Sequence, residues 1–301
     1  MLTLYTFNRR LIVLKRPLAS IIITRSALTR TLTSIALRKM SAPASKRQKT
    51  SAPYELIYWP AIPGRGEFIR LCFEETKTPY TDVSNTSGNG AKSVVEQIST
   101  KNHGSGDNPP PLAPPILRHG DLLISQVPNI LLYLGPRLGL AGPEGDENAL
   151  YRINELALTA LDGFSDEAHD THHPIATTDY YENQTEEAKA RSKDYIKNRL
   201  PKFLGYFERV LQSQGSRGGE WLYGGQLTWA DLVLWQGLDG VGYAFPIAVK
   251  KLKEGGDYKR VFALFDRVGQ RGGMKEYLES GRRLKYGKGI WRHYLELDAE
   301  E

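Results

Sequence analysis

A strand, a loop and a helix follow one another in residues 55–70, which read ELIYWPAIPGRGEFIR. The apolar run at 56–59 is typical of a β-strand, and it stops at Pro60, where a loop rich in Pro and Gly begins. The helix that opens at Arg65 presents unpaired N–H groups and the positive end of its dipole. Tyr58 adds a phenol donor where the strand ends. The segment therefore predicts a site for an anionic or thiolate-bearing ligand.

Charge is distributed unevenly along the chain. Residues 1–54 contain eleven of the 40 Lys and Arg residues and no acid, so the rest has 29 basic against 34 acidic residues, near −5. That balance gives no reason to expect nucleic-acid binding. No apolar run approaches the roughly 18 residues that a membrane span requires. The single cysteine, Cys72, excludes an intrachain disulfide and favours a reducing compartment.

Residues 1–53 are predicted to be an N-terminal extension. Their first 40 residues are rich in Arg, Ser, Thr and Leu, a composition typical of a mitochondrial transit peptide. Alternatively, Met40 is the natural start, which leaves a short tail whose KRQK cluster is only a weak nuclear signal. The first alternative predicts a mitochondrial location and the second a cytoplasmic one.

Residues 54–137 alternate between strand and helix patterns. Strands are predicted at 56–59 and 80–83 around a helix at 65–76, followed by a long polar loop with one helical piece at 93–99. A hairpin is predicted at 116–124 and a helix at 128–134, which Gly135 and Pro136 should end. This order predicts a thioredoxin-like α/β domain.

Beyond the linker at 138–145 no strand candidate remains, so residues 144–301 are predicted to form an all-helical domain. Apolar residues recur at helical spacing over 150–164 and 186–212, and Pro201 should interrupt the second helix. Thr228 and Asp231 have the spacing of a capping box at the start of a third helix. Further helices fit 257–268 and 273–280.

The order of these motifs over residues 54–280 resembles a diverged Tyr-type glutathione transferase of the mu, pi and sigma group. In that family Tyr-Phe/Trp-Pro leads into Gly-Arg-x-Glu, so the resemblance implies that Tyr58 is catalytic and that Arg65 lies in the glutathione site. Arg65 follows Tyr58 by seven residues, one more than usual, which indicates an insertion in the loop 61–63. The implied architecture is the cytosolic-type glutathione transferase fold, an α/β thioredoxin-like domain plus an all-α C-terminal domain.

Two further segments match motifs of the family. Residues 113–117, APPIL, resemble its Val-Pro-x-Leu, in which a cis-proline exposes the preceding backbone to glutathione. Pro114 and Pro115 fill these positions, but Pro114 has no N–H to donate. Gln126 matches the family's glutamine at a helix start, whereas Val127 replaces the serine that follows and keeps only a backbone N–H.

The resemblance also implies partners and a reaction. Asp166 matches an acid that reaches across a homodimer to the γ-glutamyl amine, although a simple solvated helix acid is the alternative. Arg70 matches a structural arginine near the domain interface. Glutathione would be a co-substrate, with no other cofactor, and its thiolate, activated by Tyr58, would attack a small hydrophobic electrophile. A non-catalytic binding or assembly module and a glutathione-dependent isomerase remain open.

Three histidines lie in the segment HDTHHP. His169 and His173 are four residues apart, which suits a metal on a helix, but Pro174 follows and no nearby Cys or Glu completes a ligand set. We therefore predict no metal and a polar helix end that borders the electrophile pocket or is exposed. Cys72 lies on the apolar face of the first helix and is predicted to be buried rather than redox-active.

Overall fold

The computed structural model describes residues 52–86, 88 and 90–299. The predicted extension at 1–53 lies outside these residues, apart from its last two. The first half of the described chain contains four strands with short helices between them. They are β1 (Tyr54–Ile57), η1 (Gly64–Gly66), α1 (Glu67–Glu75), β2 (Tyr80–Asp82), α2 (Val83–Thr86), α3 (Lys92–Ile98), β3 (Ile116–His119), β4 (Leu122–Ser125) and α4 (Val127–Leu138).

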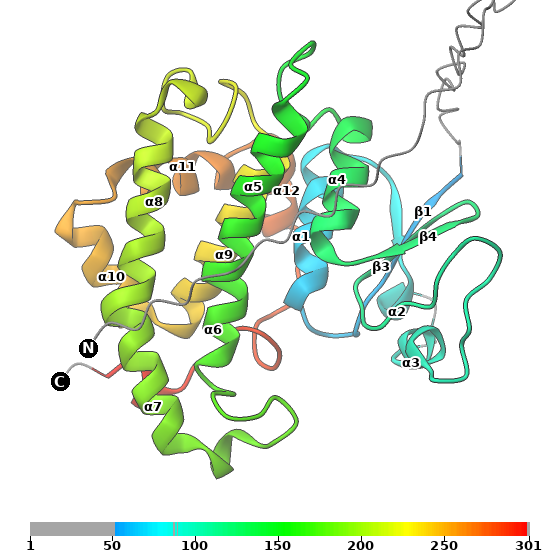
Figure 1. The fold of residues 1–301 in the computed structure, drawn as a ribbon, viewed down its shortest axis with the longest axis horizontal. Helices are drawn as coiled ribbons and strands as arrows, with labels where there is room; N and C mark the ends of the chain where they lie inside the picture. Colours follow the sequence, from blue (N-terminus) through cyan, green and yellow to red (C-terminus); the bar gives the residue numbers. More distant parts are fainter. Residues whose placement is uncertain (1–51, 87, 89, 300–301) are drawn as a thin grey trace, which may run out of the picture. The chain divides into compact units, whose positions relative to one another are not determined.

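The four strands form one mixed sheet in the order β2-β1-β3-β4 (Figure 1). β1 is parallel to β2 and antiparallel to β3, and β3 and β4 form the predicted hairpin. Ile57 pairs with Ile116, which in turn pairs with Ser125. The sheet therefore confirms the thioredoxin-like α/β order that the sequence predicts.

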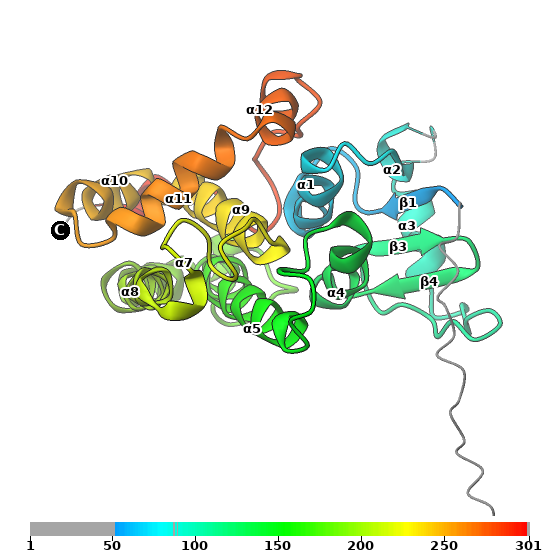
Figure 2. The ribbon, with the colours of Figure 1, turned by 90° about the horizontal axis from the view of Figure 1, so that it is seen from above.

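Alternating residues of the sheet contact helices on opposite faces, as the two-residue period of a strand requires. Leu56 and Leu117 belong to the main core, to which α1 and α4 also contribute. Ile57 and Ile116 form a smaller core with Val94 of α3. Figure 2 shows α1 and α4 between the sheet and the helices of the second half.

The second half contains only helices and turns among the described residues. They are α5 (Ala149–Leu161), the π-helical turn η2 (Asp162–Asp166), α6 (Glu167–Asp170), η3 (Tyr181–Asn183), α7 (Thr185–Asp194), the π-helical turn η4 (Tyr195–Arg199), α8 (Leu200–Gln212), η5 (Gln214–Ser216), α9 (Trp229–Ala244), α10 (Pro246–Gly255), α11 (Lys259–Gly269), α12 (Gly272–Glu279) and η6 (Leu295–Leu297). In this part of the chain no single helix is long and apolar enough to cross a membrane. Only α9 and α10 taken together reach the necessary length and apolar composition, and this pair is bent by 119°. The all-α character predicted for this half is confirmed.

Proline affects two helices in different ways. Pro201 lies in the first turn of α8, directly after the π-helical turn η4, so the predicted interruption of the long helix is confirmed. The predicted end of α4 near residue 134 is wrong, because α4 continues through Pro136 to Leu138. α4 packs closely against Trp229 at Gly135, where a Cβ would overlap the tryptophan ring. Gly135 therefore serves close packing of α4 rather than helix termination.

The helix α10 is absent from the sequence prediction. Pro246 opens it at a position where the missing proline N–H has no cost. Asp298, far away in the sequence, accepts hydrogen bonds from the N–H groups of Ile247 at 2.7 Å and Ala248 at 3.1 Å. The cap that defines this helix therefore comes from the end of the chain.

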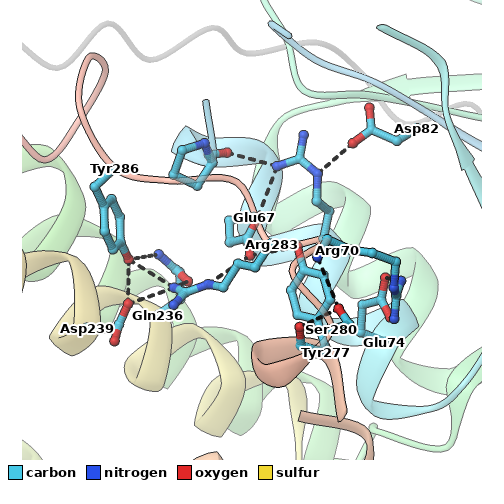
Figure 3. Close-up of polar contacts among 12 residues, drawn as sticks. Glu67, Arg70, Glu74, Asp82, Gln236, Asp239, Tyr277, Ser280, Arg283 and Tyr286 are labelled. Atoms are coloured by element: carbon cyan, nitrogen blue, oxygen red, sulfur yellow. Dashed lines mark hydrogen bonds and ion pairs between the residues drawn. The ribbon is translucent and has the colours of Figure 1, made fainter. Parts of the chain in front are cut away.

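A buried polar network joins α1 to α9 and to the segment around α12 (Figure 3). The fully buried Glu67 accepts hydrogen bonds from Arg70 at 3.1 Å, Tyr277 at 3.0 Å and Arg283 at 3.3 Å. Arg283 also donates to Asp239 at 2.7 Å. These contacts confirm Arg70 as a structural residue and connect the sheet half of the molecule to its helical half.

Candidate functional site

Three of the predicted site residues come together at one end of the sheet. Tyr58 follows Ile57, the last residue of β1, and Pro115 precedes Ile116, its partner on β3. Gln126 follows Ser125, the residue of β4 that pairs with Ile116. One step beyond the last paired residues, Tyr58, Pro115 and Gln126 therefore lie side by side on neighbouring strands.

Tyr58 is enclosed by the loop that leads into α1. Its side chain is 5% exposed, and its Oη accepts a hydrogen bond from the backbone N–H of Arg65 at 2.8 Å. Gly64, at φ 45°, and Gly66 lie against the ring, and a Cβ on Gly66 would stand 2.7 Å from the Cγ of Tyr58. The glycines of the loop are therefore required by the close approach of the backbone to this phenol.

The phenol of Tyr58 is protonated at neutral pH. Burial raises its pKa above the usual value near 10, while the N–H of Arg65 and the charges of Arg65 and Arg70 act in the opposite direction. Because Oη accepts from Arg65, the hydroxyl hydrogen of Tyr58 is available to donate to another group.

The other two strand ends supply backbone groups. The peptide bond between Pro114 and Pro115 is cis, as the resemblance implies. Gln126 has φ 72° and ψ 121°, a backbone conformation that is costly for a residue other than glycine and that concentrates at ligand sites. Its side chain is exposed, whereas the side chain of Val127 is buried in the core. Val127 can therefore offer a ligand only its backbone N–H, in the first turn of α4.

Arg65 connects this sheet end to the helical half. Its guanidinium forms an ion pair with Asp166 of η2 at 2.6 Å, and the two side chains are 36% and 49% exposed. The resemblance places the acid at this position against a ligand in a partner subunit, but here its partner is Arg65 of the same chain. Asp166 therefore has an ion-pair partner within its own chain, at the residue whose backbone N–H contacts Tyr58.

The three histidines lie one turn beyond Asp166, and the structure corrects one expectation about them. His172 and His173 are buried rather than exposed. Burial and neighbouring positive groups lower the pKa of His169 to about 4 and that of His172 to about 2, and burial also lowers the pKa of His173. All three imidazoles are therefore neutral at pH 7.

Cys72 is fully enclosed in α1, as the sequence predicts. Burial, followed by the nearby carboxylate of Glu75, raises the pKa of its thiol. A thiol that stays protonated and enclosed is a poor nucleophile, which is consistent with a packing role.

Known proteins are similar to this chain in sequence. Residues 169–281 match the family model described as the glutathione S-transferase C-terminal domain. A glutathione S-transferase of Plasmodium falciparum is 28% identical over 198 residues, which cover 65% of this chain and 83% of the relative. Glutathione S-transferase P 1 of Xenopus laevis is also 28% identical, over 57% of this chain and 70% of its own length.

Solved structures show the same architecture. The Pi-class glutathione S-transferase of Onchocerca volvulus aligns with a TM-score of 0.55 at 24% identity, covering 75% of this chain and 92% of that one. Prostaglandin synthase D of Nilaparvata lugens aligns with the same TM-score at 21% identity, covering 77% and 100%. The chain therefore has the glutathione S-transferase fold, and its residues 169–281 are similar to the C-terminal domain of that family.

Proposed function

We propose that this chain is a glutathione transferase in which the hydroxyl of Tyr58 stabilises the glutathione thiolate. The observation that carries the proposal is the position of Tyr58 beside cis-Pro115 and Gln126 at one end of the sheet. The Arg65 N–H on the phenol oxygen supports a donor role for Tyr58, because it leaves the hydroxyl hydrogen for the sulfur.

The reaction needs the thiol to lose its proton. An ordinary thiol with a pKa near 8.5 is mostly protonated at pH 7 and is then a weak nucleophile. A hydrogen bond from Tyr58, together with the field of the helix that begins beside Arg65, favours the thiolate. The thiolate then forms a C–S bond at an electrophilic carbon, and the leaving group departs with the bonding electron pair. A ring-opened epoxide or an enolate would instead take up a proton.

The rest of glutathione would be bound mainly by backbone groups. The carbonyl of Pro114 accepts the cysteinyl N–H, but this residue donates no hydrogen bond in return. The N–H of Val127 and the side chain of Gln126 bind the γ-glutamyl end near the start of α4. The missing donors on Pro114 and Val127 predict weaker glutathione binding than in relatives that keep both groups.

Retention on immobilised glutathione, followed by turnover of aryl halides, epoxides and enones, tests this function. We expect retention that free glutathione reverses and conjugation of at least one of these classes. Retention without any turnover would instead favour a non-catalytic binding module. Rearrangement of a substrate without consumption of glutathione would favour an isomerase that uses the same thiolate. Failure to bind glutathione would refute the proposal.

Asp166→Asn should raise the KM for glutathione by at most about fivefold and leave kcat nearly unchanged. The ion pair with Arg65 is half exposed, and such pairs are worth roughly 0.2–1 kcal/mol. Steady-state kinetics with varied glutathione measures this. Asp170→Asn is the matched control, since Asp170 pairs with Arg191 at 3.7 Å on the same helical segment. A large fall in kcat for Asp166→Asn alone would give Asp166 a different role.

The homodimer, the mitochondrial or cytoplasmic location and the domain limits at 54–137 and 144–301 stay predictions from the sequence. The electrophile is proposed only as a small hydrophobic molecule.

A further inference from the structure

The structure gathers His169, His172 and His173 into one cluster at the end of α6. The three ring centroids lie 4.8–5.0 Å apart. Each residue offers a ring nitrogen, and the three nitrogens lie within 4.8 Å of one another. Within the residues that the structure describes, no other group of three His, Cys, Asp or Glu side chains is close enough to hold a metal ion together.

The backbone fixes the cluster in place. His172 and His173 follow His169 by three and four residues, so the helical turn at the end of α6 brings each of them beside His169. The N–H of His172 donates to the carbonyl of His169 at 3.2 Å, which continues the helical course past α6. After Pro174, the buried Gln184 accepts a hydrogen bond from the N–H of Ile175 at 2.9 Å and so anchors the following loop. The histidines therefore lie on a turn that hydrogen bonds fix in place, rather than on an unsupported loop.

Hydrogen bonding favours ligation by His172. Its Nε2 lies 3.3 Å from the carbonyl oxygen of Gly289, and only a protonated ring nitrogen can donate to a carbonyl. The neutral ring then carries its lone pair on Nδ1. Histidines that bind metals commonly donate the other ring N–H to a carbonyl in this way, which fixes the tautomer.

His173 supplies an independent observation. The residue is 9% exposed, and its Nδ1 is buried without any hydrogen-bond partner. Buried polar atoms without partners are uncommon and unfavourable. A metal ion bound at Nδ1 would give this nitrogen the partner that the protein does not provide.

Charged groups of both signs lie near the cluster. Arg65 and Arg292 contribute positive charge near the cluster, whereas Asp166 and Asp170 contribute negative charge. The three ring nitrogens would have to approach to about 3.3 Å from one another to meet one tetrahedral ion at 2.0–2.1 Å. Adjustments of roughly 1 Å in the ring positions would achieve this, starting from the observed separation of at most 4.8 Å.

In contrast to the absence of a metal predicted from the sequence, we propose that His169, His172 and His173 bind one divalent transition-metal ion of the zinc type. Three imidazoles select such ions over Mg²⁺ and Ca²⁺, which prefer oxygen ligands. Three protein ligands also leave a fourth position for water or a small anion. The proposal rests on the three imidazoles and not on Tyr58, so it does not depend on the proposed transferase activity.

Titration of the metal-free, untagged full-length chain with Co²⁺ tests the site, because Co²⁺ reports tetrahedral nitrogen ligation in its visible absorption. We expect about one equivalent to bind, and Zn²⁺ to displace it. His169→Gln and His173→Gln should each weaken binding at least roughly tenfold, since even outer-shell changes at metal sites cost 10–100-fold. His169 is partly exposed, so its substitution should leave the fold intact.

His103→Gln is the matched control, because His103 is exposed and lies in the polar loop between α3 and β3. It should bind Co²⁺ like the unaltered chain. Zn²⁺ should also raise the melting temperature of the unaltered chain more than that of His169→Gln. The absence of stoichiometric Co²⁺ binding, or equal affinity in the folded His169→Gln and His103→Gln variants, would overturn the proposal.

Discussion

Tyr58→Phe is expected to lower kcat/KM for glutathione conjugation at neutral pH by roughly one to three orders of magnitude. Phenylalanine keeps the ring that packs against Gly64 and Gly66 but cannot donate a hydrogen bond to the sulfur. It also leaves the N–H of Arg65 without its acceptor, so a stability loss of about 1 kcal/mol is expected. Most of the kinetic loss should therefore be chemical rather than structural.

The pH dependence of kcat/KM shows whether the loss in Tyr58→Phe comes from weaker ionisation of the thiol. As pH rises through the thiol pKa near 8.5, free glutathione ionises by itself, and the difference between Tyr58→Phe and the unaltered enzyme should shrink. Profiles of kcat/KM from pH 6 to 9 measure this. Tyr54→Phe is the control, because Tyr54 pairs with His119 at the opposite end of β1. Equal activity in the Tyr58→Phe and Tyr54→Phe enzymes would transfer the donor role to another group, such as Ser125.

The features that the sequence predicted well depend on residues close together in the chain. The strand, loop and helix around Tyr58 need only the order of Pro60, Gly64 and Arg65. The capping box spans four residues, whereas the cis bond at Pro115 was implied only by the resemblance of a five-residue motif to the family. Local backbone chemistry decides such features, so a single sequence can reveal them.

The features that the sequence alone did not reveal depend on residues far apart in the chain. Glu67 and Arg283 are 216 residues apart, and Arg65 and Asp166 are 101 residues apart, so no spacing rule connects them. The close packing of α4 at Gly135 involves the ring of Trp229, which lies 94 residues further along the chain. Burial of His172 similarly depends on the C-terminal segment that carries Gly289. Tertiary packing overrode the local signal in each case.

Asp231→Ala is expected to reduce the free energy of unfolding by about 3–5 kcal/mol at pH 7.5 and the melting temperature by roughly 10 °C. The sequence alone suggests only the 0.5–2 kcal/mol of a lost helix cap. The structure raises this figure because the fully buried carboxylate accepts hydrogen bonds from the N–H of Leu222 and from the N–H and hydroxyl of Thr228, each at 2.8 Å. All three donors would lose this acceptor in the alanine variant.

The stability difference between the unaltered protein and Asp231→Ala should also depend on pH. Burial raises the pKa of Asp231 to about 6 from 3.8, against the opposing effect of its hydrogen bonds. A carboxyl whose folded pKa is raised binds its proton more tightly in the folded state, so its contribution to stability grows as pH falls from about 7 to 4. The advantage of the unaltered protein over Asp231→Ala should therefore be larger at pH 5 than at pH 7.5 in chemical denaturation.

Asp231→Asn is the matched control, since the amide keeps one acceptor oxygen but lacks the titrating proton. It should fall between the other two proteins in stability, and its difference from Asp231→Ala should be nearly independent of pH. Because Asp231 lies at the start of α9, inside the helical half, the specific activity of folded Asp231→Ala should match that of the unaltered protein at low temperature. A loss of less than 1 kcal/mol, or a catalytic defect without a lower melting temperature, would show that this carboxylate does not hold the start of α9 in place.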